Sequence, residues 1–466
     1  MKKFVIGIQA KKMITVVVIG LLFFGPNTLA SITQENCTSV SFVDPKLEDA
    51  IRSAINKTAG SLTSCDVGNL TFLAADNREI NDINGIEALS SLQNLSLSNN
   101  TITNLSPLVK LNSLVSLILT GNNINDLAPL SNLIELERLL LSNNDIDNLA
   151  SLSDLTNLTA LVLSFNRIND LQPLSALPRL QDLSLVSNDV SDLGPLSALS
   201  QLQTLDLTSN RVNDLSPLST LSNLQTMLFS SNQIDDVSPL EGLTKLQTLV
   251  LSSNQVRDLQ PLAGLNALLG LNLNANLVQD LSPLVNLMNL QTLVLDSNQI
   301  ASVEALSGLV NLQNLTLNFN DIENLTPLGN LNKLQRFNAS SNLITDIGAL
   351  SKIEAIRFLD LSTNQIENIT PLSNLISLQV LNLSNNQISD LNPLSMLFNL
   401  RSLDLAMNNI TDISVLLSLS NSDGSSSLSE GGTVDLSDNP LDAHACEEVI
   451  PTLEENGLIV TQDSCS

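Results

Sequence analysis

The chain has 466 residues, of which 43% are hydrophobic and only 2% aromatic, with no Trp and no Tyr. This apolar content excludes a disordered polar chain and predicts a sizeable buried core. The formal charge of −27 argues against a nucleic-acid-binding surface, because such a charge repels phosphates.

Residues 1–30 are typical of a secretory signal peptide. Four lysines precede the apolar run at 13–24, and the stretch ends in Thr28-Leu29-Ala30. The alternative is an uncleaved anchor, but this run of 12 residues is short of the roughly 20 that a bilayer requires. We therefore expect cleavage near Ala30, no membrane span afterwards, and a secreted, periplasmic or cell-surface location. The mature chain would carry 16 basic and 47 acidic residues, a formal charge of −31 that serves solubility or attracts cations or a basic partner.

Residues 31–69 are expected to form an N-terminal cap. Asp44 is a suitable N-cap and Pro45 a suitable first residue for a helix, and Gly60 is the expected stop. The helix would turn one apolar face toward the rest of the chain, comprising Leu47, Ala50, Ile51, Ala54 and Ile55.

Residues 70–419 repeat with a period of 22. The asparagine that ends each Leu-x-Leu-x-x-Asn, here called the anchor asparagine, recurs without a slip at Asn100, Asn122, Asn144, Asn166, Asn188, Asn210, Asn232, Asn254, Asn276, Asn298, Asn320, Asn342, Asn364, Asn386 and Asn408. Arg78 holds the same register one step earlier, and Asn439 restarts it later. A 22-residue coil cannot bury its own leucines, so stacked coils must share one apolar column. The register predicts 16 or 17 such coils.

The anchor asparagines are interpreted as a structural ladder. Where each coil leaves its strand, backbone groups turn inward and need partners, which an amide side chain supplies as both donor and acceptor.

Two further positions mark the outer side of each coil. Proline recurs seven residues after the anchor, which favours irregular or 3₁₀ turns over a second sheet. Aspartate recurs at +4, and each carboxylate is interpreted as capping its own turn. Weak Ca²⁺ binding by this acidic column is the alternative. The aspartates are Asp82, Asp126, Asp170, Asp192, Asp214, Asp236, Asp258, Asp280, Asp346, Asp390 and Asp412.

Residues 420–432 form a Ser/Gly-rich loop, and residues 433–466 are expected to form a last repeat and a C-terminal cap in which Pro451 breaks any helix. The mature chain has four cysteines, for which three pairings exist. Because they cluster at opposite ends of the chain, Cys37–Cys65 and Cys446–Cys465 is the simplest choice and fits export to an oxidising compartment.

The repeat LxxLxLxxNxIxDLxPLxxLxx and the cap FVDPKLEDAI resemble the leucine-rich repeat domains of bacterial internalin-type proteins, over roughly residues 40–441. The resemblance implies an α/β solenoid: a curved, right-handed superhelix with a parallel β-sheet on its concave face, irregular or 3₁₀ turns on its convex face and a helical N-terminal cap. It also implies that protein partners bind the concave sheet. Unlike that family, the sequence has no wall-sorting motif and carries Cys pairs at its ends.

Positions −6, −4 and −2 from each anchor should face the concave side, because they alternate with the buried leucines. Apolar and β-branched residues there indicate partner contacts, although such residues also simply favour strands. The candidate partner-binding residues are Ile118, Arg138, Leu140, Val162, Leu228, Val250, Val294, Arg336, Phe358, Asp360 and Asp404. Phe358 is interpreted as the lone aromatic exposed on this face.

Together these features predict an exported protein that binds a protein partner and needs no cofactor or metal. The alternative is a structural or adhesive envelope protein whose acidic array organises cations. An enzyme is disfavoured, because His444 is the sole histidine and no phosphate loop or nucleophile motif occurs.

Overall fold

The computed structural model describes residues 37–420, 428 and 431–463. The proposed signal peptide, most of the Ser/Gly-rich loop and Cys465 lie outside these residues, so the predictions made for them remain predictions.

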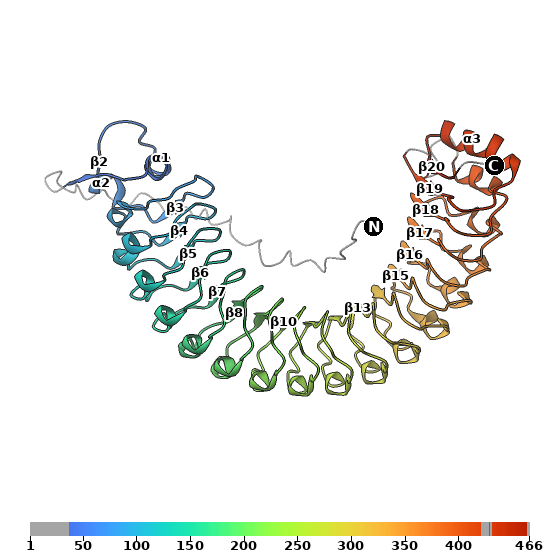
Figure 1. Ribbon diagram of the computed structural model, residues 1–466, viewed down its shortest axis with the longest axis horizontal. Coiled ribbons are helices and arrows are strands. Elements are labelled where there is room, and N and C mark those ends of the chain that lie inside the picture. The colour runs from blue at the N-terminus through green and yellow to red at the C-terminus, as the bar shows by residue number, and fades with distance from the viewer. Residues whose placement is uncertain (1–36, 421–427, 429–430, 464–466) are drawn as a thin grey trace, which may run out of the picture.

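The chain forms a solenoid that curves into an open arc, with the strands along its inner side (Figure 1). Eighteen parallel strands make one sheet. In the described part of the chain β3 pairs with β4 alone and β20 with β19 alone, so the sheet has two edges. The strands are β3 (Phe72–Ala74), β4 (Asn94–Ser96), β5 (Ser116–Ile118), β6 (Arg138–Leu140), β7 (Ala160–Val162), β8 (Asp182–Ser184), β9 (Thr204–Asp206), β10 (Thr226–Leu228), β11 (Thr248–Val250), β12 (Gly270–Asn272), β13 (Thr292–Val294), β14 (Asn314–Thr316), β15 (Arg336–Asn338), β16 (Phe358–Asp360), β17 (Val380–Asn382), β18 (Ser402–Asp404), β19 (Thr433–Asp435) and β20 (Ile459–Thr461).

The outer side of the arc consists of short 3₁₀ helices, as the recurring prolines predict. Most of them begin with a proline in the first turn, where the missing N–H has no partner to lose. They are η3 (Ile86–Ala88), η4 (Ser106–Lys110), η5 (Ala128–Leu130), η6 (Ala150–Leu152), η7 (Gln172–Ala176), η8 (Gly194–Ala198), η9 (Ser216–Leu218), η10 (Ser238–Leu240), η11 (Gln260–Leu262), η12 (Ser282–Leu284), η13 (Glu304–Leu306), η14 (Thr326–Asn330), η15 (Gly348–Lys352), η16 (Thr370–Leu372), η17 (Asn392–Leu394) and η18 (Ser414–Leu419).

One apolar core runs the length of the arc. In a typical coil the leucines at −8, −5 and −3 and the apolar residues at +2, +5, +8 and +11 are all fully buried, as Leu92, Leu95, Leu97, Ile102, Leu105, Leu108 and Leu111 illustrate. Parallel strands stack about 4.8 Å apart, so each coil covers the leucines of the next. The spacing read from the sequence therefore describes the core correctly.

The N-terminal cap packs helix α1 (Pro45–Ala54) over the first coil. The Asp44 carboxylate accepts the Lys46 N–H at its own helix start and the Asn81 N–H of the first coil, both at 2.9 Å. Burial alone would raise the pKa of Asp44, but these hydrogen bonds lower it overall. The helix ends earlier than expected, since Asn56 adopts a left-handed φ of 54° and Ala54 is exposed. The prediction that Gly60 stops the helix was therefore wrong.

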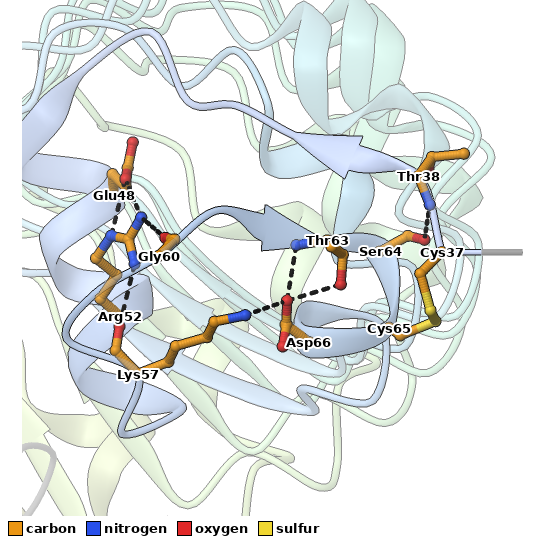
Figure 2. Close-up of polar contacts among 10 residues, drawn as sticks. All are labelled: Cys37, Thr38, Glu48, Arg52, Lys57, Gly60, Thr63, Ser64, Cys65 and Asp66. Atoms are coloured by element: carbon orange, nitrogen blue, oxygen red, sulfur yellow. Dashed lines mark hydrogen bonds and ion pairs between the residues drawn. A yellow bond between two sulfur atoms is a disulfide. The ribbon is translucent and has the colours of Figure 1, made fainter. Parts of the chain in front are cut away.

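A disulfide and a polar cluster fasten the outer part of this cap (Figure 2). Cys37 and Cys65 are bonded, which confirms that predicted pair. The bond links the chain just before β1 (Ser39–Val40) to the short helix α2 (Ser64–Val67), which follows β2 (Leu62–Thr63), the antiparallel partner of β1. The Asp66 carboxylate accepts hydrogen bonds from Lys57 Nζ and from the Thr63 N–H and hydroxyl. These hydrogen bonds lower the pKa of Asp66 to about 2, and the bond from Lys57 contributes most.

The C-terminal cap differs from expectation in two ways. A wide π turn (Ala445–Val449) leads directly into helix α3 (Ile450–Glu455), so Pro451 lies in the first turn of α3 and does not break the helix. The π turn lets the chain continue where proline lacks a donor. The chain then adds β20 to the sheet, an eighteenth strand that the repeat register did not predict. Among the described helices none is long and apolar enough to cross a membrane.

Candidate functional site

The same backbone frame recurs in every coil and presents a short row of side chains to the concave side. In β10, Met227 points into the core and is fully buried, whereas Thr226 and Leu228 on either side are half-buried. Neighbouring strands pair in register, so Leu228 lies beside Asp206 on one side and Val250 on the other. Residues at −4 therefore form one continuous column along the inner face, here called the concave column.

The anchor asparagines hold this frame together. Asn232 Nδ2 donates to the Phe229 carbonyl of its own coil at 3.1 Å and to the Leu207 carbonyl of the previous coil at 2.9 Å, and its Oδ1 accepts the Val212 N–H at 2.9 Å. The Phe229 carbonyl also accepts from Asn254 of the next coil. Each asparagine therefore bridges two coils, and these hydrogen bonds connect every coil of the repeat region to the next. Asn439 repeats the pattern after the loop, with partners nine positions further away in sequence, namely 29 and 34 residues instead of 20 and 25.

The recurring aspartates at +4 cap the outer turns. Asp236 Oδ1, for example, accepts the Ser238 N–H at 2.8 Å, and Asp126 accepts the Ala128 N–H in the same way. Asn104, Asn148 and Ser302 fill this position in other coils and make the same type of bond. Because neutral side chains do the same work, the geometry favours the capping interpretation over a carboxylate ladder for Ca²⁺.

The structure places the candidate apolar residues in separate groups. Ile118, Leu140 and Val162 lie side by side on β5–β7 and are half-buried. A second group, Leu228 and Val250 on β10–β11, is separated from the first by Ser184 and Asp206 of β8 and β9. Val294 is only 7% exposed, so it offers less contact surface than expected.

The other end of the concave column is acidic. Asp360, Asp404 and Asp435, here called the acidic end, lie on β16, β18 and β19 with Asn382 between the first two. Burial raises the pKa of Asp404, and the charges of Asp435 and Asp360 raise it further. Burial also raises the pKa of Asp206.

The two concave arginines have different surroundings. Arg336 of β15 stacks on the Phe358 ring of β16, with 4.1 Å between its Cζ and the ring centroid. Arg138 of β6 is exposed and lies between Ser116 and Ala160, which offer no ring.

Sequence reasoning missed several exposed apolar residues. Phe72 on β3 is 60% exposed at the same register position as Phe358, so Phe358 is not the lone aromatic on this side. The repeat register could have identified Phe72, because it lies six residues before Arg78, which occupies the anchor position of the first coil. At position −1, Phe165, Phe319 and Met407 adopt a left-handed φ between 54° and 58° and are more than half exposed. Ser, Asn or Gly fill most other coils there, and of these Gly and Asn accept this conformation most readily.

The single histidine of the sequence lies in the C-terminal cap. His444 is an exposed cap residue that lies 3.3 Å from Glu448, one helical turn away. Within residues 37–420, 428 and 431–463, no three or more His, Cys, Asp or Glu side chains are grouped so that they could hold a metal ion.

Comparison with known proteins identifies the repeat. A family model described as leucine-rich repeats in two copies matches residues 178–220, 222–264, 332–374 and 376–418. No curated protein matches the sequence.

Solved structures share the solenoid. An internalin, InlF, from Listeria monocytogenes is 28% identical and covers 80% of this chain and 96% of its own, with a TM-score of 0.58. A leucine-rich repeat protein from Leptospira interrogans is also 28% identical, covering 75% of this chain and 93% of its own, with a TM-score of 0.71.

The ectodomain of the Arabidopsis thaliana receptor kinase GASSHO1/SCHENGEN3 was solved in complex with Casparian strip integrity factor 2. It is 24% identical, covers 81% of this chain and 51% of its own, and has a TM-score of 0.65, so it shares the fold alone. Repeat, sheet and these similarities together show that the chain belongs to the leucine-rich repeat proteins of the bacterial internalin type.

Proposed function

We propose that this chain is exported and binds a protein partner through its concave sheet, without catalysing a reaction. The observation that carries the proposal is the contrast between constant and variable positions. The core leucines, the anchor asparagines and the turn caps recur in coil after coil, whereas the concave column changes from apolar to acidic along the arc. Side chains that the fold does not constrain are the ones that can determine which partner binds.

The apolar group on β5–β7 supports a contact surface. Ile118, Leu140 and Val162 occupy neighbouring strands and are half-buried before any partner arrives. Covering the rest of each side chain contributes on the order of 1 kcal/mol, and the rigid backbone keeps the ordering cost low. Leucine-rich repeat relatives that bind protein or peptide partners, such as the plant receptor ectodomain, support the same use of the fold.

Capture from envelope or host-cell extracts tests the proposal. The parent chain is compared with a concave variant, Leu140→Asp combined with Leu228→Asp, and with a control outside the sheet, Ile134→Asp combined with Ile376→Asp. Ile134 and Ile376 are 52% and 57% exposed in the turns that precede β6 and β17, so the control adds the same two charges without touching the sheet. We expect the partner to be lost from the concave variant alone. Equal capture by all three proteins would exclude the concave face.

The Arg138→Ala, Arg336→Ala double variant examines the charged part of the same face. It should weaken capture while lowering the free energy of unfolding by only about 0.5–1 kcal/mol, because neither guanidinium is part of an ion pair with the described residues and only the stacking of Arg336 on Phe358 is lost. N-terminal sequencing of the exported protein tests the other half of the proposal. The first residue should lie just after Ala30, and an intact Met1 would contradict cleavage.

We also propose that residues 31–69 and 433–466 act as caps on the repeat region 70–419. The helix and hairpin of the first segment and the α3–β20 segment of the last cover the two ends of the apolar core.

A further inference from the structure

Arg336 and Phe358 form a preassembled pair on the concave face. The two residues lie directly opposite each other on β15 and β16, and the guanidinium stacks on the ring at 4.1 Å. Both are half-buried, so the ring shields one face of the guanidinium from water. Stacking fixes a side chain that would otherwise sample many rotamers, and a partner therefore loses less entropy on binding it.

The donors of Arg336 remain open. Its guanidinium forms no hydrogen bond or ion pair with any residue that the structure describes, although the chain has 47 acidic residues. Three other arginines form ion pairs: Arg52 with Glu48, Arg167 with Asp145 and Arg211 with Asp189. A guanidinium carries five N–H donors in a planar fork that fits a carboxylate. Arg336 is thus held in place with that fork unused.

The surroundings of the pair restrict which carboxylate can reach it. Positions −6, −4 and −2 of the repeat carry two arginines, Arg138 and Arg336, but seven aspartates: Asp76, Asp182, Asp206, Asp296, Asp360, Asp404 and Asp435. Asp360 lies on the same strand as Phe358, and Asp404 and Asp435 follow within three strand steps, about 14 Å. A free anion would be repelled by this surface. A carboxylate flanked by basic groups would be attracted.

We propose that the Arg336–Phe358 pair is the subsite that receives a carboxylate from a partner segment that is otherwise basic. The inference rests on the proposed function and names the chemistry of its partner. The partner's carboxylate meets the guanidinium fork, and its Lys or Arg side chains lie over the acidic end. This arrangement fixes the direction of the segment along the arc, because reversing it would place like charges together.

The acidic end supplies the complementary half of the contact. Like charges opposite one another on neighbouring strands are destabilising, and Asp404 and Asp435 are such a pair. No described lysine or arginine forms an ion pair with either of them. Basic side chains of a partner would relieve this repulsion.

Selection from a random 12-residue peptide library displayed on phage tests the subsite directly. The immobilised protein is the mature chain, and selection is repeated on Arg336→Gln. On the parent chain we expect enriched peptides to be rich in Lys and Arg and to contain one Asp or Glu at a fixed place. The acidic residue should not be enriched on Arg336→Gln. No enrichment, or enrichment without a fixed acidic residue, would overturn the proposal.

A double-mutant cycle with one enriched peptide measures the contact. Changing its acidic residue to the amide should weaken binding to the parent chain by about tenfold or more, since charged hydrogen bonds contribute about 1.5–3 kcal/mol. The same change should have almost no effect on Arg336→Gln. Phe358→Leu should give an intermediate loss, because it keeps an apolar side chain but removes the ring.

Arg138→Gln is the matched control, since it removes the same charge at the same repeat position where no ring supports the side chain. With Arg138→Gln, the acidic peptide should still bind about tenfold more tightly than its amide form. If this difference disappears equally in both arginine variants, net charge alone explains it and the subsite is wrong. If the peptide binds Arg336→Gln normally but fails on the Leu140→Asp, Leu228→Asp variant, the subsite is wrong while concave-face binding stands. If the peptide binds both variants normally, it does not bind the concave face and the subsite is wrong. If the extract capture also fails, partner binding through the concave sheet is rejected as well.

Discussion

The strands β5–β7 and β16–β19 occupy the same sheet with the same backbone, yet they present opposite surfaces. On β5–β7 the concave column reads Ile118, Leu140, Val162, and on β16–β19 it reads Asp360, Asn382, Asp404, Asp435. Behind both stretches lie the same buried leucines and the same amide hydrogen bonds, such as those of Asn144 and Asn408. Fold stability and surface chemistry are therefore carried by different positions of one repeat.

This separation has a physical cause. A position that faces the core or bridges two coils is constrained by burial and by backbone groups that need partners. A position that faces the concave side is constrained less, chiefly by the preference for a strand conformation. Substitutions should therefore affect stability or binding according to their place in the repeat, whichever coil they occupy.

The largest effect on stability is expected from the shared frame. Asn232→Ala removes the acceptor of the buried Val212 N–H, and the described part of the chain offers no replacement. It also removes one of the two amide donors to the Leu207 carbonyl and one of the two to the Phe229 carbonyl. We expect the free energy of unfolding to fall by about 2–3 kcal/mol in denaturant titrations. Asn223→Ala is the matched control, because Asn223 donates to the Ser200 carbonyl at an exposed site. An equal loss in both variants would contradict the ladder.

A smaller effect is expected at the turn caps. Asp236→Ala should cost about 1 kcal/mol, because the Ser238 N–H loses its acceptor. Asp236→Asn should cost little, since an amide oxygen accepts the same bond, as Asn148 does for Ala150. Calorimetric titration with Ca²⁺ should show no uptake that Asp236→Asn reduces. Uptake at several sites, lowered by that variant, would favour the cation-organising alternative.

The smallest expected effect depends on pH. The raised pKa of Asp404 means that its protonated form fits the folded state better. Its favourable contribution is thus complete below the ordinary carboxyl pKa of 3.8 and is lost as the pH rises through the raised value. Asp404→Asn mimics the protonated form and should stabilise the protein by about 0.5 kcal/mol at pH 7.

Thermal unfolding of the two proteins at pH 7 and at pH 3 checks the sign. The stabilisation by Asp404→Asn should disappear at pH 3, where the parent side chain is itself protonated. A difference of the same size at both pH values would show that the charge is not its cause. Asp236→Asn serves as the comparison, because it removes a carboxylate that lies on the outer turns and not beside other aspartates of the concave column.

The sequence predicted the sheet, the outer turns and the core well. The same contacts recur with a fixed period, so the role assigned to each repeat position rests on many coils at once. Prediction failed where the period ends. The π turn before Pro451 and the added strand β20 depend on how the last segment packs, which no repeat encodes. The pairing of Arg336 with Phe358 was also out of reach, although both residues were candidates, since ring stacking depends on rotamers.

The most direct test of the account is hydroxyl-radical footprinting of the mature chain with and without its captured partner. We predict that the partner protects Leu140, Leu228 and Phe358 on the concave face. Oxidation of Ile134, Ile376 and Met396, which are 52–58% exposed in turns outside the sheet, should be unchanged. Protection of these outer residues with no change at the concave ones would contradict the account.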